Sequence, residues 1–77
     1  MDETSKFGES IVNNSDKILQ VLKDSGEMSS WDLKLKLHLS SSALYLALGR
    51  LFANQDIQLF QKDLTYIIKP LIKTETN

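Results

Sequence analysis

The chain has 77 residues, a hydrophobic content of 42% and a formal net charge of −1, which are values typical of one small globular domain. It has no cysteine, which excludes a disulfide framework and a thiolate metal site. The overall charge lacks the basic excess typical of strong nucleic-acid binders, although a local basic face would be hidden in that average. No apolar run is long enough to cross a bilayer, and the polar N-terminus is not a signal peptide. We therefore expect a cytoplasmic protein with no membrane partner.

The two ends of the chain differ in composition from its middle. Residues 1–8 are polar and have no hydrophobic periodicity, and residues 71–77 are similar. We expect flexible tails at both ends. The folded domain is therefore predicted at residues 9–70.

The first helix is predicted over residues 9–24. Ile11, Ile18 and Leu22 fall on one stripe at helical spacing. Gly26 follows shortly after as a stop signal.

Residues 31–39, WDLKLKLHL, alternate apolar and polar side chains, which taken alone predicts a half-buried strand. The flanking sequence favours a helix instead. Ser29 precedes Asp32 by three residues, a weak form of the capping box, so a helix is predicted to begin near residue 30. Wound as a helix, the segment turns Leu33 and Leu37 toward the other helices.

A second start signal, SSS at residues 40–42, opens a long apolar helix that is predicted to end near Asn54. One side of this helix is a continuous apolar stripe, which we assign to the core. Its members are Leu44, Ala47, Leu48 and Leu51.

The last third of the chain has the composition of strands. Residues 57–60 and 64–69 are rich in β-branched and aromatic side chains, and the short polar connection 61–63 suits a hairpin that ends at Pro70. A short strand at residues 27–29 could join it. The element order predicts an α+β, mainly α fold of the winged helix-turn-helix type, with three helices followed by a β-hairpin wing.

The stretch LYLALGRLFANQDIQLF resembles a small family of uncharacterised bacterial and archaeal winged helix-turn-helix domains, whose third helix carries a pattern like ALGWLAREGKI before the wing. The similarity covers about residues 11–69. Arg50 stands where the family usually has Trp, and Ser15-Asp16 replaces its Ala-Gly pair. Because the family's function is itself inferred from its fold, the resemblance implies architecture more than activity. The matching positions in and after the third helix are Ala47, Leu48, Gly49, Leu51 and Ile57.

The third helix is in the position of a DNA-recognition helix, whose N-terminal part enters the major groove. Its candidate DNA contacts are Ser40, Ser41, Ser42 and Tyr45, with the alternative that the serines only cap the helix. Lys34 and Lys36 on the second helix and Lys62 at the wing tip are candidate phosphate contacts. The alternative for these lysines is a solubilising role.

Two apolar faces are candidate partner-binding surfaces. Leu46, Gly49 and Ala53 lie opposite the core stripe of the third helix, where a protein partner or the chain's own N-terminal segment could cover them. Trp31 and Leu35 form a stripe on the outer side of the second helix. There they could form an interface, or Trp31 could fold back over the wing or the N-terminal segment.

The residues give no sign of an enzyme. His38 is the only histidine, and no Gly-rich phosphate loop, metal-ligand spacing or nucleophile–base pair is present. We expect no catalytic residue, metal, cofactor or small-molecule ligand. The leading hypothesis is a homodimeric DNA-binding domain of transcription-regulator type with double-stranded DNA as its partner. The alternative is a protein-interaction module that binds itself or another protein through the apolar faces of the second and third helices, without nucleic acid.

Overall fold

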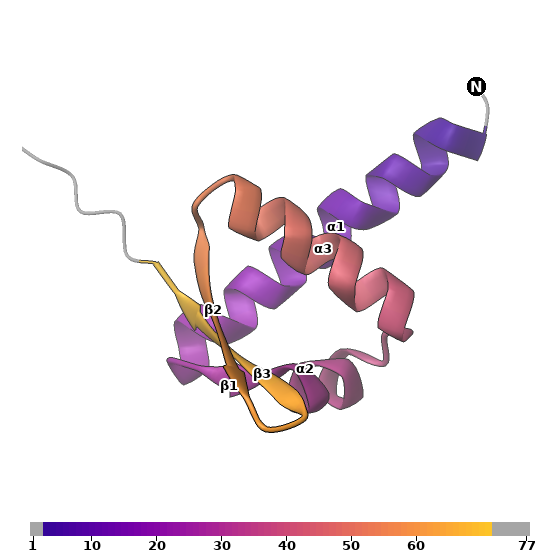
Figure 1. The fold of residues 1–77 in the computed structure, drawn as a ribbon. Helices are drawn as coiled ribbons and strands as arrows, with labels where there is room; N and C mark the ends of the chain where they lie inside the picture. The colour runs from indigo at the N-terminus through magenta and orange to yellow at the C-terminus, as the bar shows by residue number, and fades with distance from the viewer. Residues whose placement is uncertain (1–2, 72–77) are drawn as a thin grey trace, which may run out of the picture.

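The computed structural model describes residues 3–71, with side chains described from residue 6 onward. Three helices are followed by an antiparallel hairpin, and a short strand between the first two helices joins its sheet (Figure 1). This layout confirms the predicted α+β, winged-helix-like fold. The elements in chain order are α1 (Glu3–Ser25), β1 (Met28–Ser29), α2 (Ser30–Leu37), α3 (Ser41–Ala53), β2 (Ile57–Lys62) and β3 (Thr65–Pro70).

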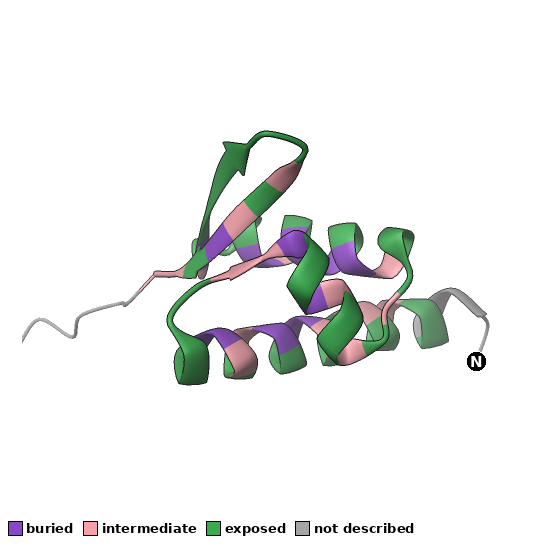
Figure 2. Ribbon diagram, turned by 90° about the horizontal axis from the view of Figure 1, so that it is seen from below, coloured by how far each residue is buried: buried purple, intermediate pink, exposed green. Residues whose placement is uncertain are grey.

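Helix α1 begins at Glu3, six residues before its predicted start, so the expected N-terminal tail is helical from Glu3 onward. The apolar stripe of the helix continues to Phe7, four residues before Ile11, because residues four apart lie on the same face of a helix. One end of α1 projects beyond the other helices (Figures 1 and 2). Residues 72–77 of the expected C-terminal tail lie outside the described residues.

Helix α2 contains the alternating segment, so the strand-like pattern there is misleading. Ser29 is the N-cap, and its Oγ accepts a hydrogen bond from the Asp32 amide at 3.0 Å, as the sequence predicts. Leu33 is fully buried. The helix ends at Leu37, and its C-cap residue His38 adopts the left-handed conformation with φ of 56°.

Helix α3 has the predicted bounds and core. Ser40 is its N-cap, with its Oγ accepting from the Ala43 amide at 3.1 Å, and Asn54 is its C-cap. The predicted core stripe is buried along its whole length, from Leu44 to Leu51. Figure 2 shows these positions on the inner side of the helix.

The hairpin formed by β2 and β3, here called the wing, has a tighter turn than the sequence predicts. Lys62 pairs with Thr65, which leaves a two-residue loop at Asp63 and Leu64 in place of the expected connection at 61–63. Asp63 has a φ of 55°, a conformation that aspartate tolerates better than most residues. Strand β1 pairs with the edge of β3 that β2 does not occupy, giving the order β1-β3-β2.

The core lies where α1, α2, α3 and the base of the wing meet. It consists of apolar side chains with exposed fractions of 3% or less: Ile18, Leu22, Leu33, Leu44, Ala47, Leu48, Leu51, Ile57 and Ile68. Two serines are buried with them. Ser15 Oγ donates to the Ile11 carbonyl at 2.7 Å and lies 3.4 Å from the Ala47 carbonyl of α3.

Ser30 joins the start of α2 to the wing. Its Oγ lies 2.8 Å from Thr65 Oγ1 and accepts from the Tyr66 amide at 3.2 Å. Removing the Ser30 hydroxyl therefore leaves the Tyr66 amide without its protein acceptor at a part-buried site.

We therefore expect Ser30→Ala to lower the free energy of unfolding by about 1–2 kcal/mol. Urea denaturation followed by circular dichroism measures this loss. Ser42→Ala is the matched control, since Ser42 is exposed in the first turn of α3, and it should leave stability nearly unchanged. Equal effects of the two substitutions would contradict a structural role for the Ser30 hydroxyl.

Candidate protein-interaction surface

Helix α3 and the wing enclose an apolar groove of about 500 Å³ on the outer side of the domain. Tyr45, Leu48 and Gly49 line it from α3, and Leu59 and Tyr66 line it from the wing. The rings of Tyr45 and Tyr66 meet edge to face across it, with centroids 6.1 Å apart and planes at 82°. Because buried side chains anchor both α3 and the wing in the core, the groove between these two elements stays open.

The periodicities of helix and strand explain why these side chains converge. On α3, Tyr45 and Gly49 are one turn apart. On the wing, Leu59 pairs with Ile68, and Tyr66 lies two residues from Ile68 on the same face of β3. The face that buries Ile68 at the base of the wing thus continues outward as an open apolar surface.

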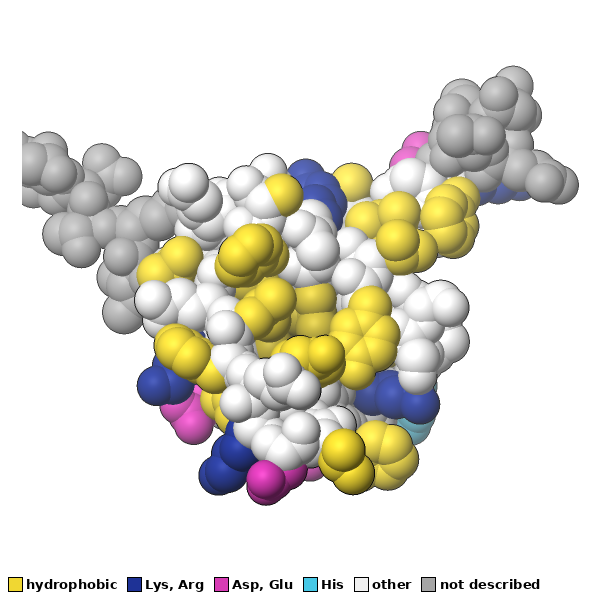
Figure 3. All heavy atoms as spheres, viewed as in Figure 1, with side chains coloured by type: hydrophobic (Ala, Val, Ile, Leu, Met, Phe, Trp, Pro, Cys, Tyr) yellow, Lys and Arg dark blue, Asp and Glu magenta, His cyan; other side chains and the backbone are white. Residues whose placement is uncertain are grey.

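The groove lies within a larger exposed patch, which we call the α3–wing surface. Figure 3 shows hydrophobic side chains gathered over the middle of this face. Within α3, Arg50 is the only charged residue, and it is half-buried. An exposed apolar cluster of this kind often marks a site where another molecule binds. The α3–wing surface comprises Tyr45, Leu46, Gly49, Phe52, Leu59 and Tyr66.

Three predicted partner-binding residues lie on or beside this surface, because Leu46, Gly49 and Ala53 are all exposed on α3. A Cβ added at Gly49 would meet no atom within 4 Å, so no other described segment packs directly against this glycine. Helix α1 instead contacts the opposite side of α3, where Ser15 lies near Ala47. The alternative that the chain's own N-terminal segment covers this face is therefore wrong for the described residues.

The other two predicted partner-binding residues, Trp31 and Leu35, lie on the outer side of α2, with exposed fractions of 59% and 55%. The Lys34 ammonium sits 5.5 Å from the Trp31 ring centroid, a cation–π contact. The wing reaches the pocket beside Trp31 through Leu64 and Thr65 but leaves most of the indole exposed. Trp31 thus lies beside the wing tip, as one of the two alternatives has it, but the wing does not bury it.

The predicted DNA-contacting residues are only partly brought together. Lys34, Ser41 and Tyr45 line one pocket of about 390 Å³ at the N-terminal end of α3, beside Trp31 and Leu64. The Ser40 hydroxyl is engaged in capping. Three further predicted residues are exposed and do not line this pocket: Lys36, Ser42 and Lys62.

Sequence reasoning missed Phe52, Leu59 and Tyr66. The spacing of Tyr45 and Phe52, seven residues apart on α3, was an available signal for a common helix face. No comparable signal identified the wing residues. Leu59 and Phe60 are adjacent and equally apolar, so only the register of the hairpin decides which one faces α3.

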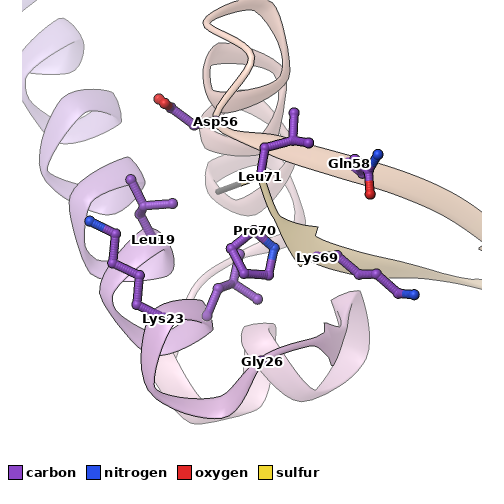
Figure 4. A pocket seen from close by; sticks show the side chains of 9 residues that line it. Leu19, Lys23, Gly26, Asp56, Gln58, Lys69, Pro70 and Leu71 are labelled. Atoms are coloured by element: carbon purple, nitrogen blue, oxygen red, sulfur yellow. The ribbon is translucent and has the colours of Figure 1, made fainter. Parts of the chain in front are cut away.

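A second hollow, of about 660 Å³, lies between the C-terminal half of α1 and the base of the wing. Lys23 and Lys69 lie at its rim, but their side chains diverge (Figure 4). Lys69 also forms an exposed ion pair with Glu27 at 3.5 Å and a cation–π contact with Phe60 at 5.3 Å. The two lysines of this hollow thus do not converge on a common ligand.

Among residues 3–71, no three His, Asp or Glu side chains lie close enough to hold a metal ion. None of the helices in this range has the length and hydropathy needed to cross a bilayer.

Comparison with known proteins found no match among protein-family models, curated proteins or solved structures. The family resemblance drawn from the third helix thus stays a prediction.

Proposed function

We propose that this chain is a protein-interaction module that self-associates through the α3–wing surface. The observation that carries the proposal is the character of this face: five large apolar side chains are partly exposed around a groove, where a DNA-binding winged helix needs polar and basic groups. Aromatic and leucine side chains in a partly open pocket have the composition of an interface centre.

The charge distribution supports a protein partner over a nucleic acid. DNA affinity depends on cations that neutralise phosphates, and α3 supplies only Arg50. At the wing tip, the exposed Lys62 is followed by Asp63, which offsets its charge. A second protein copy, in contrast, would cover the apolar side chains and leave these charges at the rim.

DNA binding is the second candidate, favoured by one specific observation. Lys34, Ser41 and Tyr45 line a common pocket at the N-terminal end of α3, the end that enters the major groove in helix-turn-helix proteins. This arrangement supports a DNA-binding homodimer of transcription-regulator type. In that case α2 and the start of α3 would form the contact.

We expect wild-type protein to sediment as a concentration-dependent dimer and Leu46→Glu to sediment as a monomer, because the second copy would bury a carboxylate on the exposed face of α3 without an opposite charge to pair with it. Analytical ultracentrifugation measures both. Leu35→Glu is the matched control, since Leu35 is an exposed leucine on the outer side of α2. A dimer lost in Leu35→Glu and kept in Leu46→Glu would assign the interface to α2 and contradict the proposal.

We also expect no binding of pooled DNA duplexes at low salt up to roughly 100 µM protein, the range in which non-specific binders associate. Fluorescence anisotropy of labelled duplexes tests this. Binding that falls steeply with salt and is weakened by Lys34→Ala would establish the second candidate in place of the first.

A further inference from the structure

The apolar stripe of α1 continues beyond the body of the domain. Ile18 and Leu22 of this stripe are fully buried, and Ile11 is half-buried. Phe7 is 58% exposed, and Val12, beside the stripe, is also exposed. We call residues 6–13 the α1 projection, because this part of the helix extends away from α2 and α3 (Figures 1 and 2).

The chain's own contacts do not account for the α1 projection. Most helical stability in proteins comes from packing of the apolar face, so a helix end that lacks such packing is prone to fray. Gly8 weakens the helix further, and a Cβ added there would meet no atom within 4 Å, so the described part of the chain makes no close approach to it. The exposed Phe7 and Val12 side chains suit a helix that is packed against another molecule.

The α1 projection and the α3–wing surface lie on the same side of the molecule. Figure 3 shows two groups of hydrophobic side chains in one view, one over α3 and the wing and one along the projecting end of α1. One molecule thus presents both an apolar groove and an exposed apolar helix end.

We propose that the α1 projection of one copy occupies the α3–wing groove of a second copy, and that the exchange is reciprocal. This inference rests on the proposed self-association and identifies the segment that fills the groove. Because each copy gives one helix end and receives another, the assembly closes as a two-fold dimer and does not grow into a filament.

The available surface supports a reciprocal dimer. Seven large side chains on the two surfaces have exposed fractions between 36% and 58%. With ~150–250 Å² per aromatic side chain, they expose roughly 500 Å² per copy, a large share of the ~800 Å² that each partner of a stable interface buries. A single helix end in a single groove would bury much less. The seven are Phe7, Val12, Tyr45, Leu46, Phe52, Leu59 and Tyr66.

The charges near the two surfaces are compatible with this pairing. Glu9 lies on the α1 projection next to Gly8 and Val12, where these residues border a shallow hollow. Arg50 is the one charged residue of α3. The α1 projection also carries Lys6, so its formal charges cancel, and the side chains that line the groove are uncharged, so no charge repulsion opposes the pairing.

The first test introduces a charge into the α1 projection. We expect Phe7→Glu to weaken dimerisation at least ~tenfold in sedimentation, as loss of a central aromatic contact does. Phe60→Glu is the matched control, because Phe60 is similarly exposed and lies on the opposite face of the sheet from Leu59. It should leave the dimer intact. Circular dichroism verifies that each variant is folded.

The second test mixes Phe7→Glu with Leu46→Glu. Phe7→Glu retains an intact groove, and Leu46→Glu retains an intact helix end, so the mixture can rebuild one of the two contacts. We expect the mixture to associate more strongly than either variant alone. Association that stays at the level of the separate variants would overturn the exchange.

The outcomes separate this inference from the proposed function. A wild-type dimer that is lost in Leu46→Glu but kept in Phe7→Glu would overturn the exchange and leave self-association through the α3–wing surface standing. A wild-type chain that stays monomeric would overturn both.

Discussion

The crossing of α1 and α3 holds the domain together. Ser15 lies at this crossing, with its hydroxyl bonded within α1 and lying near the Ala47 carbonyl of α3. A small side chain on each helix at this point lets the flanking leucines and isoleucines interdigitate. A bulky residue at either position would separate the two helices and open the core.

This crossing determines which side of α3 faces solvent. Once Leu44, Leu48 and Leu51 are turned toward the core, the residues on the other side of the helix must point outward. In most surface helices those positions are charged. Here they are Tyr45, Leu46, Gly49 and Phe52, and the wing adds Leu59 and Tyr66 beside them. The outer face is therefore apolar because the sequence places apolar residues at positions that the packing of the core leaves exposed.

The lengths of the helices have a similar consequence. At 1.5 Å per residue, α1 is about 15 Å longer than α3. The body of the domain cannot cover both ends of such a helix. The end that projects carries Phe7 and Val12, so the domain has two apolar features that its own fold leaves open. In the proposed dimer, a second copy supplies a groove for the projecting helix end and a helix end for the groove.

The parts of the fold set by local chemistry could be predicted from the sequence. Ser29 and Ser40 cap their helices as predicted, and the stripe from Leu44 to Leu51 is buried. The hairpin register could not be predicted, because Leu59 and Phe60 are both apolar and a tertiary contact with α3 selects between them. The same holds for the candidate site: Leu46 and Gly49 follow from the helix period, whereas Tyr66 depends on the register of the wing.

The most direct measurement of self-association is an isotope-filtered NOE experiment on an equal mixture of labelled and unlabelled chain. It detects only contacts between two copies. The proposed exchange of helix ends predicts intermolecular contacts from the rings of Tyr45 and Tyr66 to the side chains of Phe7 and Val12. If the groove resonances show no intermolecular contact at a concentration where the chain is dimeric, the α3–wing surface is not the interface and the account is contradicted.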